Sequence, residues 1–205
     1  RDRITLGRYK RPDTLGLTKR VAPIWPPTER QGLPWRVRLA GLGFVAVATV
    51  PAQADLLIIG EAPGADEDRQ GEPFVGRAGQ LLNKILEAIG YGRDDVFICN
   101  ILKCRPPDNR NPAPDEILAC SGYLASQISM LQPKAILSVG GVAATTLLET
   151  GQSVGKLRGE VHDFGESRIP LVVTYHPAYL LRKPAEKAKS WIDLQLLMRV
   201  LRGVA

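Results

Sequence analysis

The stretch Leu56-Leu57-Ile58-Ile59-Gly60 decides the fold class, because it is apolar throughout and closes on a glycine. A continuous apolar run of this length is typical of a strand that is buried on both faces of a sheet. Downstream, Ala78–Ile89 carries apolar side chains at helical spacing and stops before Gly90, which predicts a helix. The chain therefore begins a strand–helix alternation at residue 56.

The same alternation continues toward the end of the chain. Further apolar runs predict strands over residues 96–102, 135–139 and 171–174. Helical periodicity predicts helices over residues 114–131, 142–148 and 187–200. Strands that alternate with helices form parallel sheets with helices packed on the faces. We therefore expect an α/β fold, a three-layer α/β/α sandwich around a central, mostly parallel four-stranded sheet.

The segment before this alternation has a different character. A β-branched run over residues 45–49 predicts one more strand, which Pro51 ends. Before it, prolines interrupt any helix or central strand, at Pro12, Pro23, Pro26, Pro27 and Pro34. We therefore expect two parts, a basic, Pro-rich N-terminal arm over residues 1–40 and a folded domain over residues 41–205.

The net charge of +6 is concentrated in the leading segment. Residues 1–50 carry ten Lys or Arg and three Asp or Glu, whereas residues 51–205 carry 17 basic and 18 acidic side chains. Excess positive charge favours acidic or nucleic-acid partners. The arm is either an extension that adds affinity for such partners or a solvated tail without a binding role.

Length and composition exclude several classes of protein. A chain of 205 residues with 44% hydrophobic content predicts one globular domain. Its apolar stretches are too short for a membrane-spanning helix, and residues 1–20 lack the apolar run of a signal peptide. We therefore expect a cytoplasmic protein. Three cysteines are too few for a disulfide framework and indicate free thiols or metal ligands.

Glycine and polar residues follow directly on the predicted strands. Gly60 and Glu61 follow the first strand, Asn100 lies in the second, and Gly140 and His176 follow the next two. Ligands of open α/β sheets bind outside the carboxyl ends of the strands, so we expect these residues to converge on one edge. Each also has a plain structural explanation, since Asn100 can cap a turn and His176 can be a satisfied loop histidine.

Two other features favour structural roles. His162 precedes Asp163 in an expected hairpin, where we expect it to be structural or exposed. The loop after residue 60 is acidic, so it would repel a phosphate group, and it lacks the Lys and Ser/Thr of a P-loop. Without a ligand, the same loop would simply be mobile, with Phe74 as an apolar plug over the sheet.

Three ordered blocks of sequence resemble the motifs of family 4 uracil-DNA glycosylases. The first block reads GEAPGADED from Gly60 and GEPFVG from Gly71 to Gly76. The second is Asn100 followed by KCRPP over residues 103–107, and the third is HPAYLLR over residues 176–182. Three blocks in order across residues 54–203 are far more specific than any one of them. The resemblance implies hydrolysis of the bond between uracil and deoxyribose in DNA, which starts base-excision repair.

The resemblance also implies a uracil pocket. Such enzymes flip the target nucleotide out of the DNA stack before they act on it. By position, Phe74 should stack on the flipped uracil, the amide of Asn100 should read its polar edge, and Gly60 should let the backbone approach it closely. Glu67 should crowd C5 of the ring, where thymine carries a methyl group.

Two further residues should carry the chemistry. The transition state is cationic on the sugar and anionic on the departing base, so a carboxylate near the sugar and a donor near the base stabilise it. His176 should stabilise the charge that grows on O2 of uracil. Glu61 should either orient the attacking water or stabilise the sugar cation.

The resemblance places DNA contacts in the third block. Tyr179, Leu180, Leu181 and Arg182 should form the loop that enters the duplex, an apolar wedge beside a phosphate-binding charge. Arg105 should also meet DNA. The alternative for both leucines is a place in the core. We expect a monomer that acts on single- or double-stranded DNA and does not contact a membrane.

The cysteines of the chain supply only part of the ligand set for the cofactor that the resemblance implies. Family 4 enzymes usually carry a 4Fe–4S cluster held by four cysteines. Cys104 and Cys120 stand where the later pair is expected, but no cysteine precedes Cys99, which is more typical of a buried thiol. The chemistry itself requires no cofactor.

Other functions fit the same features less well. A glycosylase for hypoxanthine, xanthine or a mismatched base would share the fold. A DNA-binding module that keeps the pocket without turnover is a second alternative. A Rossmann-like nucleotide-binding protein is disfavoured, because the glycine fingerprint is missing and the loop is acidic.

Overall fold

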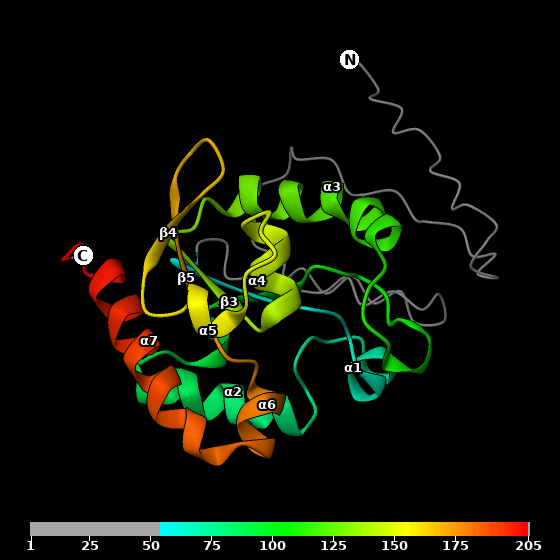
Figure 1. Cartoon of the computed structure of the whole chain (residues 1–205), viewed down its shortest axis with the longest axis horizontal. Coiled ribbons are helices and arrows are strands. Elements are labelled where there is room, and N and C mark those ends of the chain that lie inside the picture. Colours follow the sequence, from blue (N-terminus) through cyan, green and yellow to red (C-terminus); the bar gives the residue numbers. More distant parts are fainter. Residues whose placement is uncertain (1–53, 205) are drawn as a thin grey trace.

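The computed structural model describes residues 54–204, so the predicted arm and the strand predicted over residues 45–49 lie outside the described part. Residues 54–204 form three layers, with a sheet between two groups of helices (Figure 1). The α/β/α sandwich that the sequence predicts is therefore confirmed. No helix within residues 54–204 combines the length and the apolar character needed to cross a membrane.

The central sheet has five strands in the order β2-β1-β3-β5-β4. They are β1 (Leu56–Gly60), β2 (Phe97–Asn100), β3 (Ala135–Val139), β4 (Val161–Phe164) and β5 (Ile169–Thr174). All neighbours pair in parallel except β4, which is antiparallel to β5. The prediction of four strands was one short. The missing strand, β4, lies at the edge of the sheet and alternates exposed with half-buried residues, so no apolar run marks it.

Helices cover both faces of this sheet (Figure 1). They are α1 (Ala65–Gln70), α2 (Arg77–Ala88), α3 (Pro114–Leu131), α4 (Gly141–Leu147), α5 (Val154–Leu157), α6 (Pro177–Arg182) and α7 (Lys187–Leu201), with short 3-10 turns η2 (Arg93–Asp95), η3 (Pro107–Asn109) and η4 (Pro184–Glu186). The four longest agree with the predicted ones to within a residue or two at each end. Helices α1, α5 and α6 span fewer than two turns and leave no periodic signal in the sequence.

Strand β1 shows why its apolar run is continuous. Leu57 and Ile59 pack in the core under α3, α4 and α5, whereas Leu56 and Ile58 pack in the core under α2 and α7. All four side chains are fully buried, since successive residues of a strand point to opposite faces. A strand in the middle of a sandwich therefore needs apolar residues at every position.

The register of the sheet places the carboxyl ends of its parallel strands side by side. Gly60 at the end of β1 pairs with Asn100 at the end of β2. On the other side, Val139 at the end of β3 pairs with Thr174 at the end of β5, two residues before His176. The residues expected to form a site therefore meet at one edge.

Candidate active site

Gly60, Phe74 and Asn100 lie together at this edge, and we call this group of residues, with His176, the candidate pocket. A Cβ atom at Gly60 would lie 2.5 Å from Oδ1 of Asn100 and 2.6 Å from Cζ of Phe74. The absence of a side chain at Gly60 thus makes room for both groups. Phe74 is 6% exposed and Asn100 is 5% exposed. The structure therefore brings an aromatic ring and an amide together against bare backbone.

Asn100 presents an unsatisfied acceptor in this pocket. Its Oδ1 is buried and has no hydrogen-bond partner within the described residues. A buried polar atom without a partner costs free energy, about 1–3 kcal/mol. An acceptor left open at the pocket of Gly60 and Phe74 is therefore suited to a ligand that brings a donor.

His176 completes the pocket from the other half of the sheet. Its ring stacks on Phe74, with 5.5 Å between the ring centroids and 30° between the planes. Gly140, at φ +101°, lies behind it, and a Cβ there would lie 3.1 Å from Cβ of His176. Of the two neighbouring glycines, only Gly140 touches the histidine in this way, since a Cβ at Gly141 would meet Val154 instead.

The environment of His176 fixes its charge and its tautomer. Burial, together with the nearby positive charge of Arg182, lowers its pKa to about 4, although Glu67 opposes this shift. The imidazole is therefore neutral at neutral pH. Its Nδ1 accepts a hydrogen bond from the backbone N–H of Ala178 (3.1 Å), so the ring proton resides on Nε2. Nε2 is thereby a donor.

Glu61 follows Gly60 and is half-buried. Burial raises the pKa of its carboxyl group above the ordinary value. Its backbone carbonyl accepts the N–H of Leu102 (3.0 Å), which ties the end of β1 to the segment after β2. The chain position of Glu61 therefore places its backbone directly next to Gly60.

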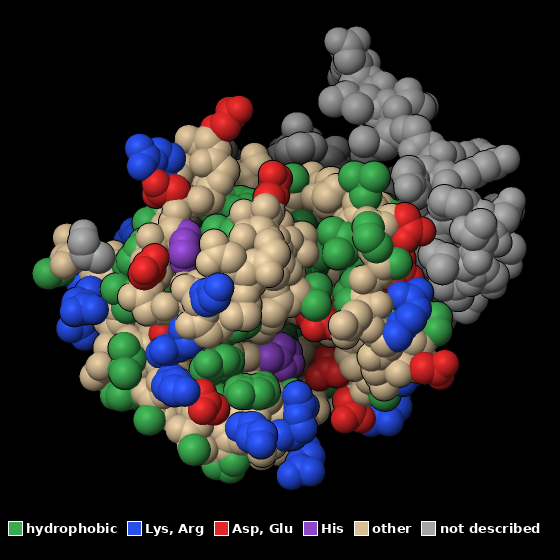
Figure 2. All heavy atoms as spheres, viewed as in Figure 1, with side chains coloured by type: hydrophobic (Ala, Val, Ile, Leu, Met, Phe, Trp, Pro, Cys, Tyr) green, Lys and Arg blue, Asp and Glu red, His purple; other side chains and the backbone are tan. Residues whose placement is uncertain are grey.

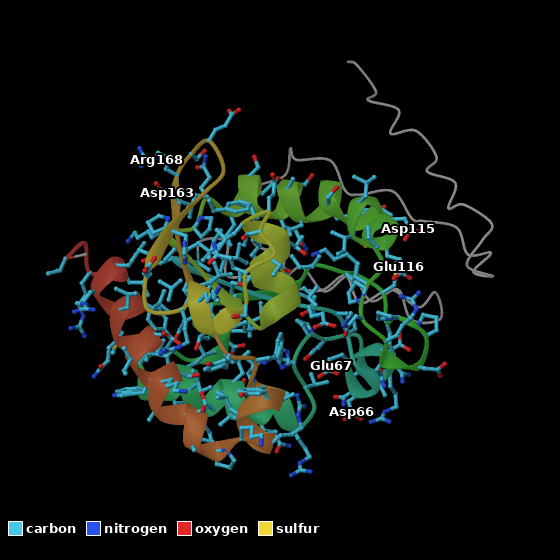
Figure 3. The ribbon with its side chains drawn as sticks, viewed as in Figure 1. Asp66, Glu67, Asp115, Glu116, Asp163 and Arg168 are labelled. Carbon is cyan, nitrogen blue, oxygen red and sulfur yellow. The ribbon has the colours of Figure 1, made fainter. Side chains whose placement is uncertain are left out.

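Glu67 organises the loop that carries Phe74. Its Oε1 accepts hydrogen bonds from the N–H groups of Val75 and Gly76 (both 3.0 Å), and its Oε2 accepts one from Gly64 (3.1 Å). Figure 3 shows Glu67 on α1, beside Asp66. The sequence suggested only a contact with the base, whereas the structure shows a carboxylate that joins both ends of the loop.

Two basic residues near the pocket have structural roles that the sequence did not predict. Lys103 is 5% exposed, and its Nζ donates to the carbonyl of Asn100 (2.6 Å) and to Oε1 of Gln127 (2.7 Å). Arg93 donates to the carbonyls of Pro73 and Phe74. Both contacts join segments far apart in sequence, and a lone basic residue gives no signal of such a partner.

Of the residues expected to contact DNA, one is buried and the others are at least partly exposed. Leu180 is 1% exposed, so the expectation that it forms part of a wedge is wrong for this conformation; it belongs to the core. Leu181 is 38% exposed, and Arg182 follows it at the surface. Tyr179 packs on Tyr175, with ring centroids 5.0 Å apart. Arg105 lies on a different loop, where it donates to Oδ1 of Asn109 (2.8 Å).

Exposed basic residues follow Leu181 along the chain. Figure 2 shows Lys and Arg gathered over α6 and the start of α7, next to acidic side chains over α1. Exposed basic residues of this segment are Arg182, Lys183, Lys187 and Lys189. The surface beside the pocket is therefore suited to the phosphates of a nucleic acid.

The cysteines do not supply a cluster site. Cys104 and Cys120 are half-buried, and Sγ of Cys120 accepts the backbone N–H of Lys103 (3.5 Å), whereas Cys99 is buried within β2. The chain has three cysteines, one fewer than a four-thiolate ligand set. Across residues 54–204, no three His, Cys, Asp or Glu side chains are grouped as metal ligands would be. The residues present therefore do not fit a 4Fe–4S cluster held by this chain alone.

His162 lies away from the pocket, on β4. Its Nε2 is 2.7 Å from the carbonyl oxygen of Leu157, which gives it a structural partner. Figure 3 shows Asp163 and Arg168 of the same hairpin far from Glu67. The structural role expected for His162 is consistent with this place.

Comparisons with known proteins show which family the chain resembles. The family model described as the uracil DNA glycosylase superfamily matches residues 47–195. The chain is 42% identical to the type-4 uracil-DNA glycosylase of Pyrobaculum aerophilum, over 72% of the chain and 80% of that protein. It is also 42% identical to the type-4 enzyme of Thermotoga maritima, over 67% of the chain and 77% of that enzyme. A type-5 uracil-DNA glycosylase of Pyrobaculum aerophilum is 30% identical, over 76% of the chain and 75% of that enzyme.

Proposed function

The chain belongs to the uracil-DNA glycosylase superfamily, and we propose that it removes uracil from DNA as the first step of base-excision repair. It is a hydrolase of N-glycosyl bonds. The observation that carries this proposal is the buried, unpartnered Oδ1 of Asn100, which faces a pocket walled by Phe74. A flipped uracil has both the donor and the flat face that these two groups require.

Asn100 selects uracil over cytosine. Uracil presents N3–H as a donor beside O4 as an acceptor, whereas cytosine presents an acceptor beside an amino donor. Oδ1 of Asn100 accepts from N3–H, and its amide nitrogen donates to O4. In the same orientation, cytosine would set acceptor against acceptor and donor against donor. A site built around such hydrogen bonds discriminates strongly, because a mismatched base leaves buried polar groups unpaired.

Phe74 and Glu67 shape the rest of the base pocket. The ring of Phe74, which packs against the bare backbone of Gly60, stacks on the uracil. Glu67 lies at the loop that carries Phe74 and crowds C5 of the base, so a methyl group there is excluded. Its three backbone hydrogen bonds hold this carboxylate in place, which makes the exclusion rigid.

His176 assists departure of the base. When water adds to C1′, the bond between C1′ and N1 breaks, and its electron pair leaves with uracil as an anion. The Nε2–H of neutral His176 donates to O2, where part of this charge resides. The products are free uracil and an abasic site. A neutral donor suits this role, because its proton is shared without first being taken up from solvent.

Glu61 faces the sugar. A carboxylate at this place balances the positive charge of an oxocarbenium-like sugar and accepts a proton from the attacking water. Its burial beside the pocket supports the assignment, since charge acts more strongly where water is excluded. Glu61 thus has both roles that the sequence left as alternatives, action on the attacking water and stabilisation of the sugar cation.

The DNA contacts follow the exposed part of the third block. Leu181 is the apolar side chain that enters the space of the flipped nucleotide, with Tyr179 beside it. Arg182 and Arg105 meet phosphates on either side of the pocket. The basic segment over α6 and α7 extends this surface, so DNA affinity should weaken as salt rises.

The wider setting follows from the substrate. We propose that residues 1–40 form a basic arm that adds nonspecific DNA affinity to a glycosylase domain over residues 41–205. The enzyme acts as a monomer, in the cytoplasm where genomic DNA of bacteria and archaea resides, on single- or double-stranded DNA. No step of the chemistry passes through an iron–sulfur cluster, because the cysteines of this chain do not form its ligand set.

The test of this function is excision from defined oligonucleotides. Single- and double-stranded oligonucleotides that contain uracil, hypoxanthine or a mispaired thymine are incubated with the protein and then treated with alkali, which breaks the strand at abasic sites. We expect breakage at uracil. Breakage only at another base would indicate a different glycosylase of this fold, and binding without breakage would indicate a DNA-binding module.

A further inference from the structure

Phe74 adopts a backbone conformation that few bulky residues adopt. Its φ of +53° lies in the left-handed region, where the Cβ atom is crowded. The ring is nonetheless buried between Gly60 and His176. A strained backbone persists only where surrounding contacts determine it, so the contacts that hold Phe74 also set the position of its ring.

Hydrogen bonds hold both peptide groups that flank Phe74. Nη1 of Arg93 donates to the carbonyl of Phe74 (3.2 Å), and Nη2 donates to the carbonyl of Pro73. Glu67 holds one of the same two groups, through the N–H of Val75. Because a peptide group is planar, holding the groups on both sides of a residue fixes its φ and ψ. Arg93 contacts both groups, whereas Glu67 contacts one.

Arg93 is itself held firmly. It lies at the start of η2, is half-buried, and makes a third hydrogen bond to Oδ1 of Asn83 on α2 (3.1 Å). Burial lowers the pKa of its guanidinium group, and the charges of Glu72, Asp94 and Glu67 oppose that shift. A planar guanidinium reaches three acceptors at once, which an ammonium group at the same place does not.

The opposite side of the Phe74 carbonyl is closed as well. A Cβ at Gly79, in the first turns of α2, would lie 1.7 Å from the oxygen of Phe74. The carbonyl therefore packs tightly against α2 on one side and bonds to Arg93 on the other. Without Arg93, the carbonyls of Pro73 and Phe74 would lose their partner, and the strained turn would relax toward ordinary backbone.

From this geometry we infer that Arg93 is a positioning residue for base excision: it holds the Pro73–Phe74 turn so that the Phe74 ring faces the flipped base. The inference rests on the proposed function, since it assigns Arg93 to the base pocket of that activity. Arg93 itself touches neither the base nor the sugar in this role. Its effect on catalysis passes through Phe74.

The first test follows the stack of Phe74 on His176 and needs no substrate. The chain has two histidines, so the imidazole signals of His176 and His162 can be assigned in NMR spectra with the variant His162→Gln. A stacked aromatic ring shifts the signals of its neighbour. We expect Arg93→Ala to move the His176 signals and to leave those of His162 in place. Unmoved His176 signals would overturn the inference.

The second test is a double-mutant cycle on uracil excision. Phe74→Leu keeps an apolar side chain but removes the ring, and we expect it to lower kcat/KM by about 10- to 100-fold, the range for loss of one base-stacking contact. Arg93→Ala should cause a loss of similar size in the wild-type background and less than about threefold in the Phe74→Leu background. Equal losses in both backgrounds would show that Arg93 acts independently of Phe74 and would overturn the inference.

Two further variants keep the test decisive. Arg93→Lys retains the positive charge but removes the planar guanidinium group, so it should shift the His176 signals and lower kcat/KM. It replaces Arg93→Ala if that variant fails to fold. Arg168→Ala is the matched control, because Arg168 pairs with Asp163 on the distant hairpin, and it should leave both measurements unchanged. If the wild-type protein releases no uracil, the proposed function fails, while the NMR comparison still decides whether Arg93 positions Phe74.

Discussion

In the proposed function, Asn100 recognises the base and His176 stabilises the charge that develops on it. Asn100 offers a buried acceptor without a partner, and His176 offers an N–H whose tautomer is set by the backbone of Ala178. Both groups are held before any ligand arrives, so little reorganisation accompanies binding. Preorganised dipoles of this kind account for a large part of enzymatic rate enhancement.

Replacing Asn100 by Asp tests base selection. A carboxylate at this position accepts hydrogen bonds but does not donate to O4 of uracil, so Asn100→Asp should lower uracil excision by roughly 10²-fold. It should also allow excision of cytosine, whose amino group donates to the carboxylate. Parallel cleavage assays on uracil- and cytosine-containing oligonucleotides measure both changes. An unchanged ratio between the two bases would remove the role assigned to Asn100.

The lowered pKa of His176 predicts a dependence of stability on pH. In the unfolded chain an ordinary histidine is protonated below about pH 6.5, whereas in the folded protein His176 takes up its proton only near pH 4. The unfolded state therefore binds the proton first. As the pH falls from 6.5 to 4, the contribution of His176 to the free energy of unfolding should decrease by about 3 kcal/mol.

Denaturant unfolding of the wild-type protein and of His176→Gln, at pH 7 and at pH 4, measures this contribution. The difference in unfolding free energy between the two proteins should change by about 3 kcal/mol between these pH values. A constant difference would mean that His176 titrates with an ordinary pKa, and the lowering of its pKa by burial would then be wrong.

Among single residues, the sequence identified those that carry motifs and missed those that act through long-range contacts. Glu61, Phe74, Asn100 and His176 were named from the three blocks, and the structure places Phe74, Asn100 and His176 at one pocket. Arg93 was not named, because its acceptors lie 19 and 20 residues away and are backbone carbonyls of ordinary residues. Every residue has a backbone carbonyl, so residue types alone do not show which carbonyl accepts a hydrogen bond.

At the scale of elements, the loop from Gly64 to Gly76 is the part of the site with its own internal support. Helix α1 spans only 6 residues, yet the Glu67 carboxylate within it binds backbone at both ends of the loop. A loop closed in this way adds support for Phe74 to that given by Arg93 and α2. Rigid support of this kind is what a stacking platform requires.

Replacing Glu67 by Ala should therefore affect both stability and specificity. Three backbone N–H groups lose their acceptor, which should lower the melting temperature by several degrees, since each kcal/mol corresponds to about 2–4 °C in a chain of this size. Uracil excision should fall, and the ratio of thymine to uracil excision should rise. Melting curves and competitive cleavage assays measure these effects.

Asp66 provides the control for Glu67. It lies one residue away on α1 but pairs with Arg69 at the surface (2.5 Å). Asp66→Ala should leave melting temperature and specificity near wild-type values, because exposed ion pairs contribute little. Equal effects of the two variants would mean that the loop needs only the net charge of α1, and the specific role of Glu67 would be excluded.

Elements were predictable where burial imposes a pattern. Strand β1 is buried on both faces and reads as an unbroken apolar run, so its place in a parallel sheet followed from residues 56–60 alone. Strand β4 lies at an edge, pairs on one side and alternates exposed with half-buried residues, so it gave only a hairpin signal. Helix α6 is too short for periodicity, and for the same reason Leu180 was placed in the wedge although it is buried.

For the whole molecule, the described body is close to neutral, and its DNA surface depends on where the charges lie. The positive charge beside the pocket comes from α6 and the start of α7, opposite the acidic side of α1 (Figure 2). The excess charge of the chain belongs to residues 1–50. In the proposed function, these local clusters supply the DNA affinity, so the domain needs no large net charge.

The cysteines of residues 1–205 predict the metal content of this chain. Three cysteines, one of them buried within β2, do not complete a four-thiolate set. A protein of this sequence purified anaerobically should therefore contain less than one iron atom per chain and lack the visible absorption of an iron–sulfur cluster. Four iron atoms per chain with that absorption would contradict this account and would require an additional ligand from outside the three cysteines.

The central claim is that the pocket cleaves the bond between uracil and deoxyribose, and release of the free base measures this most directly. An oligonucleotide with one uracil is incubated with the wild-type protein, and the low-molecular-weight products are identified by mass spectrometry. The account predicts free uracil in an amount equal to the abasic sites formed, and much slower release by His176→Gln. Strand breakage that yields a uracil nucleotide instead, or no free uracil at any protein concentration, would contradict it.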